Sequence, residues 1–191
     1  MKLLITGFDP FGGETVNPAW EAVKALPEQV GECTLCKLQI PTIFGLAAEK
    51  VLAFAAECNP DVILCIGQAG GRSAITPERI AVNIRDGKIP DNAGIQPGGE
   101  PVAPNGPAAY FTTVPVNEMA TAIAGAGVPS TASNSAGAFV CNDTLYSLLH
   151  HYHGTPVRVG FIHVPYLPEQ GSPNLPLADI IRGLEAAICA L

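Results

Sequence analysis

The sequence has few charged and few aromatic residues. Of its 191 residues, 14% are charged and 6% are aromatic, while 48% are hydrophobic. No cluster of Lys or Arg stands out, and the formal net charge is −7. Nucleic acids and anionic membrane surfaces bind proteins through basic faces, so we expect neither as a partner. The large apolar fraction predicts a well-buried chain, part of whose surface other subunits cover.

Long hydrophobic runs are also missing. The apolar run near the N-terminus is cut by Gly7, Asp9 and Pro10, which makes it too short for the core of a signal peptide. No other run approaches the length of a membrane span. We therefore expect a cytoplasmic protein without a membrane partner. The length favours a single domain, residues 1–191.

The six cysteines and four histidines do not form a recognisable metal motif. Cys33 and Cys36 make a lone C-x-x-C on a strand-like segment, where residues three apart point to opposite faces. His150, His151 and His153 crowd the end of an expected helix, with no carboxylate or cysteine spaced to complete a site. We expect reduced cysteines, no metal and no cofactor.

Strand-like and helix-like segments alternate along most of the chain. The run from Asp61 to Gly67 is continuously apolar, as in a central strand buried on both faces. The other expected strands are Lys2–Phe8, Thr34–Ile40, Glu78–Arg85 and Arg158–Val164, and the expected helices begin near Asn17, Phe44, Asn117, Cys141 and Leu177. This order predicts the α/β class: a three-layer α/β/α sandwich around a mostly parallel, mixed, twisted sheet.

Cys141 is the candidate nucleophile. It follows a small-residue turn and a short apolar run, and Asn142 and Asp143 after it are good helix-capping residues. The positive end of a helix favours a thiolate and predicts a lowered pKa for Cys141. The alternative is an inert buried cysteine.

His163 and Glu78 are candidate partners at strand ends, where active sites of α/β folds gather. His163 can take a proton from a thiol and Glu78 can orient the imidazole, although a core histidine and a solvated carboxylate are the alternatives. The loop G-F-D-P-F-G-G is neither a dinucleotide nor a P-loop motif. Its Phe8 and Phe11 suit a small, flat, uncharged ligand, unless both belong to the core.

Four blocks of this sequence resemble the type I pyroglutamyl peptidases, also called pyrrolidone-carboxylate peptidases, a family of cysteine peptidases. The blocks are Gly7–Pro18, Ile66–Asp86 with Ile89–Asn92, Ser135–Asn142, and Gly160–Gln170. They occur in the order of the family and cover almost the whole chain.

The resemblance implies removal of an N-terminal pyroglutamyl residue from peptides by an α/β/α enzyme that is commonly a homotetramer. It assigns the nucleophile to Cys141, the histidine to His163 and the acid to Glu78. The positions that fall where the family lines its pyroglutamate pocket are Phe8, Phe11, Asn17, Gln68, Phe139 and Val140. Lys88 stands where the family more often has arginine, so any role of that arginine is not transferred.

Two other functions stay open at this point. The same architecture serves nucleoside phosphorylases and hydrolases, although the loop with Asp9 is a poor phosphate site. A non-catalytic module that binds pyroglutamyl peptides is the second alternative. Thiol-sensitive and phosphate-independent turnover separates the peptidase from both.

Overall fold

The structure is a computed structural model that describes residues 1–191. Its centre is a six-stranded sheet in the order β2-β3-β1-β4-β10-β5, with parallel pairing from β3 to β10 and antiparallel edge strands. The strands of this sheet are β1 (Lys2–Phe8), β2 (Gln29–Val30), β3 (Cys33–Ile40), β4 (Val62–Gln68), β5 (Thr76–Pro77) and β10 (Arg158–Val164). Every residue of β4 is buried, which confirms the central strand expected from its apolar run.

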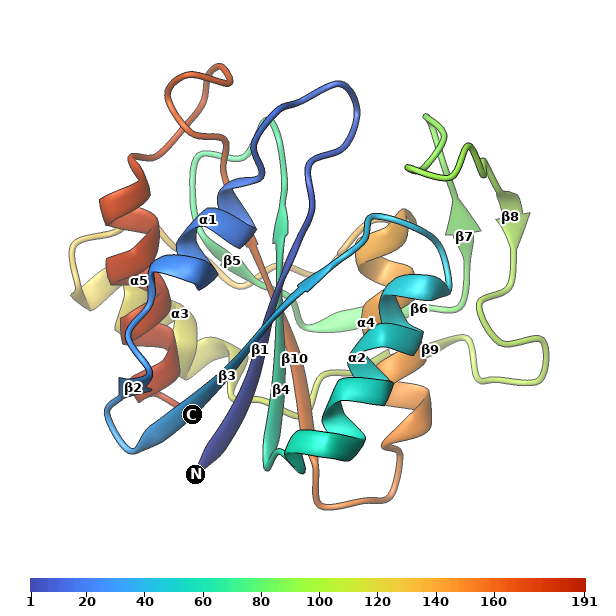
Figure 1. Cartoon of the computed structure of the whole chain (residues 1–191), viewed down its shortest axis with the longest axis horizontal. Helices are drawn as coiled ribbons and strands as arrows, with labels where there is room; N and C mark the ends of the chain where they lie inside the picture. The colour runs from blue at the N-terminus through green and yellow to red at the C-terminus, as the bar shows by residue number, and fades with distance from the viewer.

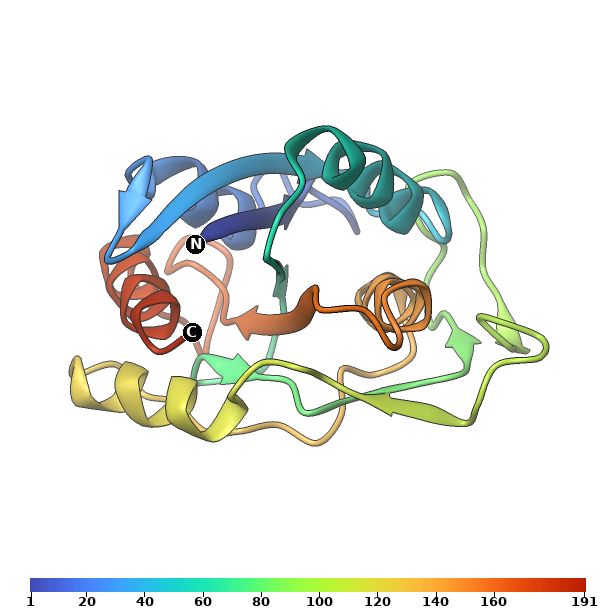
Figure 2. The ribbon, with the colours of Figure 1, turned by 90° about the horizontal axis from the view of Figure 1, so that it is seen from below.

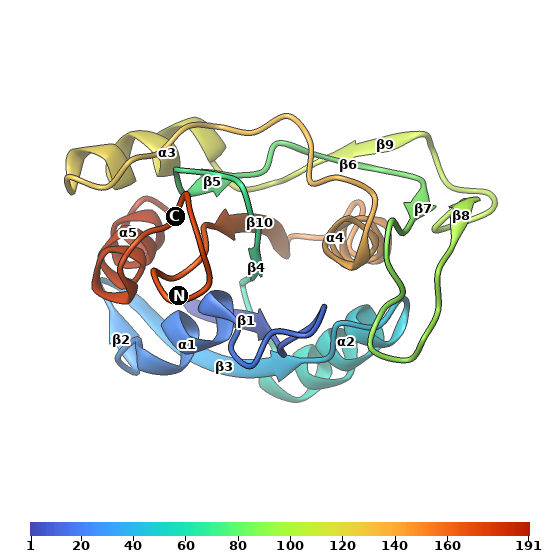
Figure 3. The same ribbon diagram turned by 90° about the horizontal axis from the view of Figure 1, so that it is seen from above.

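Helices cover both faces of the sheet. They are α1 (Pro18–Ala25), α2 (Leu46–Cys58), α3 (Val116–Gly125), α4 (Val140–His151) and α5 (Leu177–Cys189). Figures 2 and 3 show the curled sheet with α1, α3 and α5 on one side and α2 and α4 on the other. Two apolar clusters, of 26 and 18 buried residues, fill the two spaces. The predicted three-layer α/β/α class with a mixed sheet is confirmed.

The start of α1 illustrates how local sequence sets an element. The Asn17 side chain accepts a hydrogen bond from the Ala19 N–H at 3.1 Å, and Pro18 occupies the first turn. Proline tolerates this position because its missing N–H would have no partner in the helix. The predicted cap is confirmed.

The region around Glu78 differs from the single strand Glu78–Arg85 expected there. It forms β5 just before Glu78, then β6 (Ile80–Val82) and β7 (Arg85–Asp86) after it. These pair with three different partners: β5 with β10, β6 with β9 (Ala109–Phe111), and β7 with β8 (Gly98–Glu100). The alternating pattern shows which side chains are apolar, but it does not show that the pairing partner changes.

The helix expected to begin at the cap Asn117 begins one residue earlier, at Val116, with Pro115 at the cap position. The Asn117 side chain instead accepts a hydrogen bond from Arg79 Nη2 at 2.8 Å.

None of the helices combines the length and the apolar character that a membrane crossing requires. The loops after β1, β4 and β10 gather at the end of the sheet away from both termini (Figure 1).

Candidate active site

Cys141 is the second residue of α4 and is partly exposed. The helix begins at Val140, and its cap residue Phe139 makes no side-chain hydrogen bond to it. The first N–H groups of a helix lack acceptors within the helix. The backbone N–H groups of Val140 and Cys141 therefore stay free beside the thiol and are available to an oxyanion.

Gly67, near the end of β4, makes room for this thiol. A Cβ on Gly67 would lie 3.0 Å from Cys141 Sγ and 2.7 Å from Phe161 Cζ. Gly67 is also the register partner of His163 on β10. Paired residues of parallel strands point to the same face, and adjacent strands lie about 4.8 Å apart. Strand β10 and the start of α4 thus bring His163 and Cys141 to the same glycine of β4.

His163 and Glu78 form a buried couple. His163 Nδ1 lies 2.7 Å from Glu78 Oε1, with the histidine 4% exposed and the carboxylate wholly buried. Glu78 follows β5, and its backbone N–H donates to the Phe161 carbonyl at 2.9 Å. The solvated-carboxylate alternative for Glu78 is excluded by this burial, and His163 turns its Nε2 side away from the acid.

Arg72, in the loop after β4, completes the charge balance. Its Nη1 lies 2.6 Å from the same Oε1 atom of Glu78. Burial alone would raise the pKa of Glu78, but the hydrogen bond and charge of His163, with the Arg72 guanidinium, hold that pKa below its usual value. Glu78 is therefore ionised at neutral pH.

The other two groups are neutral at rest. Burial lowers the pKa of His163, and its hydrogen bond to Glu78 only partly opposes this shift. Burial also raises the pKa of Cys141 to about 12, with a further rise from the negative charge of Glu78. The lowered thiol pKa expected from the helix end is wrong for the resting site, because burial outweighs the helix dipole. Neither Cys141 nor His163 therefore carries a charge in the resting site at neutral pH.

Aromatic rings gather around Phe139, the cap residue of α4. The rings of Phe11 and Phe139 have centroids 6.0 Å apart, and Phe44 meets Phe139 edge to face at 5.2 Å. These three side chains come from the loop after β1, the segment before α2 and the cap of α4. They form an apolar wall with no fixed charge, which suits a flat neutral ring.

The comparisons with known proteins agree with this geometry. A family model described as pyroglutamyl peptidase matches residues 1–191. The chain belongs to the pyroglutamyl peptidase family. A pyrrolidone-carboxylate peptidase of Levilactobacillus brevis is 56% identical over 199 residues, with 100% of this chain and 97% of that protein covered.

Solved structures of the family share the fold. The crystal structure of pyroglutamyl peptidase I from Bacillus amyloliquefaciens is 45% identical, has a TM-score of 0.95 and covers 99% of this chain and 95% of its own. A mutant pyrrolidone carboxyl peptidase from the hyperthermophile Pyrococcus furiosus is 40% identical, with a TM-score of 0.93 and coverage of 100% and 97%.

Four of the side chains predicted to line the substrate pocket are buried. Phe8 is 1% exposed and packs on Phe161 in the core, with ring centroids 6.2 Å apart, so any part it takes is at the floor of the site. Val140 is wholly buried, which leaves its backbone N–H as the group near Cys141. Asn17 is 2% exposed. Its amide oxygen caps α1, and its amide nitrogen donates to the Asp9 carbonyl at 2.9 Å.

Gln68 is the fourth of these side chains. Its Oε1 accepts a hydrogen bond from Gln170 Nε2 at 3.0 Å, and Gln170 also reaches the Val16 carbonyl beside α1. Because neighbouring residues of a strand point to opposite faces, Gln68 leaves the face on which Gly67 meets Cys141. Gln68 can reach a ligand on that face through its backbone rather than through its side-chain amide.

Asn142 and Asp143 are not caps of α4 as the sequence suggested. Both lie inside its first turn and are buried. Asn142 bonds to the Val82 backbone in both directions at 2.9 Å. Asp143 accepts from Arg85 Nε at 2.5 Å and from the Gly45 N–H at 2.7 Å. Phe44 and Arg72 were missed because their contacts with Phe139 and with Ser135 join segments that are distant in sequence.

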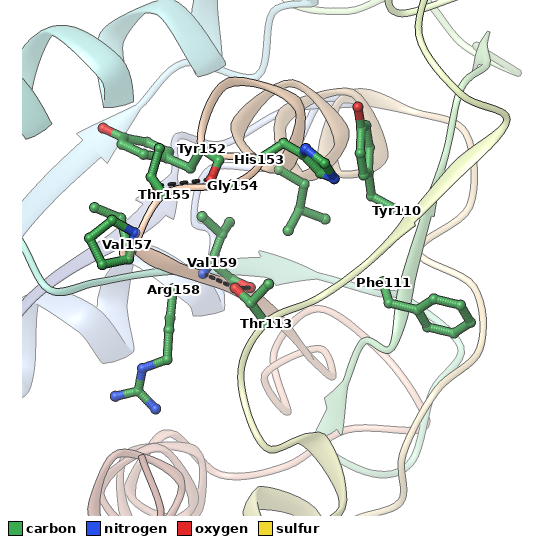
Figure 4. A pocket seen from close by; sticks show the side chains of 12 residues that line it. Tyr110, Phe111, Thr113, Tyr152, His153, Gly154, Thr155, Val157, Arg158 and Val159 are labelled. Atoms are coloured by element: carbon green, nitrogen blue, oxygen red, sulfur yellow. Dashed lines mark hydrogen bonds between the residues drawn. The ribbon is translucent and has the colours of Figure 1, made fainter.

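A separate cavity of about 250 Å³ lies at the start of β10, at the opposite end of that strand from His163 (Figure 4). Tyr110, Tyr152 and His153 surround it, and Phe111 beside it is 68% exposed. His150 contacts the Tyr110 hydroxyl through Nδ1 at 2.8 Å. None of the residues predicted for the catalytic site lines this cavity, and the histidines of the H-H-Y-H run belong to this end of the molecule.

Proposed function

We propose that Cys141, His163 and Glu78 carry out the reaction of this family, the removal of N-terminal pyroglutamate from peptides. The observation that carries the proposal is the buried His163–Glu78 bond of 2.7 Å on the face where Gly67 leaves room for the Cys141 thiol. Family membership supports a cysteine peptidase over the nucleoside enzyme and over a binding module.

The reaction begins from a neutral pair. His163 takes the proton of the Cys141 thiol, and the sulfur attacks the pyroglutamyl carbonyl carbon. The oxygen becomes an oxyanion, which the free N–H groups of Val140 and Cys141 stabilise. His163 then donates its proton to the leaving amine as the peptide bond breaks. Water, deprotonated by His163, attacks the thioester and releases pyroglutamate and the thiol.

Glu78 supports the histidine in both half-reactions. Its ionised carboxylate accepts the Nδ1–H of His163, which leaves Nε2 as the base, and it stabilises the imidazolium that forms. Burial lowers the pKa of His163 below the ordinary histidine value of about 6.5. The imidazole therefore stays neutral until the pH falls below that ordinary value. Activity then falls as the pH drops through that lowered pKa.

The apolar wall of Phe11, Phe139 and Phe44 supports selection of the lactam. Pyroglutamate is uncharged at its N-terminal end, so the ring loses little solvation when it enters an apolar site. An ordinary N-terminal ammonium would lose its hydration there without a charged partner, which disfavours its binding strongly.

The homotetramer and the cytoplasmic location stay predictions. Exposed apolar side chains such as Phe111 and Ile95 support self-association.

The test uses a pyroglutamyl-coumarin substrate. Wild-type protein cleaves it without phosphate, and Cys141→Ser loses activity by more than about a thousandfold while its circular dichroism is unchanged. Cys189→Ser is the control, since Cys189 is exposed near the C-terminus and far along the chain from the site. Substrate binding without turnover by wild-type protein would identify a binding module instead, and full activity of Cys141→Ser would reject the nucleophile.

A further inference from the structure

The guanidinium of Arg72 makes hydrogen bonds to three other residues, although the side chain is partly exposed. The side chain lies in the loop after β4 and is 29% exposed. Nη1 donates to Glu78 Oε1 at 2.6 Å and to the Thr76 hydroxyl, and Nη2 donates to the Ser135 carbonyl at 3.0 Å. One guanidinium therefore joins the loop after β4, strand β5 and the segment that leads to Cys141.

Arg72 is also the cation that balances a buried charge. Both hydrogen bonds to the Glu78 carboxylate, from His163 and Arg72, end on Oε1, and the buried Oε2 has no partner. An ionised carboxylate without exposure to water is costly unless a cation is paired with it. If Arg72 were absent, His163 would be the remaining group able to supply positive charge, by binding a second proton.

We propose that Arg72 is a positioning residue of this reaction: it keeps Glu78 ionised and aimed at His163, and it leaves the imidazole neutral and ready to accept the Cys141 proton. This inference rests on the proposed function and adds a residue to it. Arg72 acts through Glu78, because its hydrogen bonds go to Thr76, Glu78 and Ser135 and not to the Cys141 thiol.

The surrounding charges support this role. The groups that act on His163 are Glu78, from the segment after β5, and Arg72, from the loop after β4. Cys141 on α4 and Cys65 on β4 are uncharged, because burial raises the pKa of each to about 12. The Arg72 charge lowers the pKa of His163, so the loss of that charge raises it.

The experiment compares the pH dependence of kcat/KM for Arg72→Met, Arg72→Gln and Arg72→Lys on the pyroglutamyl-coumarin substrate. Arg72→Met and Arg72→Gln remove the charge, and we expect the acidic limb to move up by about one pH unit, as for other close charge pairs. Near neutral pH, kcat falls while KM changes little, since Arg72 does not line the aromatic wall. Arg72→Lys keeps the charge, so its acidic limb stays at the wild-type pH.

Arg79→Met is the matched control. Arg79 is also an arginine next to Glu78 in sequence, but its guanidinium bonds to the neutral side chains of Asn134 and Asn117 at 2.7 and 2.8 Å. We expect a wild-type acidic limb for this variant. A shift of the same size in Arg79→Met would overturn the proposal, because it would reflect a general loss of positive charge.

A structural role alone predicts a different result. Arg72→Met and Arg72→Gln would then unfold more easily but keep the wild-type acidic limb, and that outcome rejects the proposal. If Arg72→Met does not fold, Arg72→Gln and Arg72→Lys still decide, since they differ in charge and both retain a donor. Failure of the proposed function itself is recognised separately, by wild-type protein that does not cleave the substrate or by active Cys141→Ser.

Discussion

Glu78 and Asp143 are two buried carboxylates, and each is paired with one partly exposed arginine. They differ in the one further group that each carboxylate bonds to, which is the third member of its cluster and is called its third partner below. Both side chains are wholly buried, and their arginines, Arg72 and Arg85, are 29% and 28% exposed. The ion-pair distances are 2.6 and 2.5 Å. Burial, charge and partner type are thus nearly the same at the two sites.

The third partner of Asp143 is a backbone N–H, that of Gly45 at the start of α2. This group never changes charge, so Asp143 joins the start of α2 and β7 to α4 without holding a group that titrates. The third partner of Glu78 is His163, which gains and loses a proton in the proposed reaction. Under the proposed function, the two ion pairs therefore differ in whether the carboxylate also holds a group that titrates.

The largest effect is expected from Glu78→Gln. The amide keeps the size of the side chain but removes the charge that stabilises the His163 imidazolium. We expect kcat/KM to fall by roughly 10³–10⁴-fold, as when the acid of a catalytic triad becomes an amide. Steady-state hydrolysis of a pyroglutamyl-coumarin substrate measures this, and an activity above one tenth of wild type would contradict it.

The pH profile of Glu78→Gln sharpens the comparison. The hydrogen bond and the charge of Glu78 raise the pKa of His163 against the lowering by burial. Their loss lowers this pKa further, so the acidic limb of the residual activity moves to lower pH. Asp143→Asn leaves the limb in place, because Asp143 bonds to Arg85 and Gly45 and not to the histidine.

Asp143→Asn is expected to change stability rather than chemistry. The amide leaves Arg85 without a counter-charge and places an NH₂ group near a donor, and breaking a buried pair in this way costs about 3 kcal/mol of unfolding free energy. Urea denaturation measures the loss, with Asp86→Asn on the exposed part of β7 as the control. If Asp143→Asn is as stable as wild type but inactive, the division between the two carboxylates fails.

The sequence was sufficient to predict most of the fold. β1, β4 and β10 were predicted from their apolar runs, and the structure confirms their bounds to within one residue. The exchange of partners between β5, β6 and β7 was not predictable, because a strand pattern reports burial and not the neighbour. Asp143 was misread as a cap for a similar reason: its carboxylate bonds to Arg85, 58 residues away in sequence.

The candidate site was predictable in part. Strand ends and a helix start pointed to Cys141, His163 and Glu78, but no local pattern reveals that Glu78 is buried, so a solvated carboxylate stayed open until the fold was known. Arg72 lies in the block Ile66–Asp86 that resembles the family, but the sequence assigned it no role. Its partners Thr76, Glu78 and Ser135 come together only in the fold. The direction of the Cys141 pKa was wrong for the same physical reason, since burial depends on tertiary packing.

Arg85→Lys is the smallest change that still separates the two ion pairs. Arg85 is tied to its carboxylate by a single bond, from Nε to Asp143 Oδ1, which an ammonium group can replace in part. We expect a loss of about 1 kcal/mol of unfolding free energy, the usual net value of one hydrogen bond, with kcat unchanged.

Arg72→Lys provides the contrast, because a lysine cannot match the planar fork that spans Thr76, Glu78 and Ser135. It therefore reduces kcat even though it keeps the charge. Urea denaturation and kcat measured on both variants test the pair together. If Arg72→Lys and Arg85→Lys lose the same stability and have the same kcat, the two arginines have equivalent roles. The distinction drawn from their third partners would then be wrong.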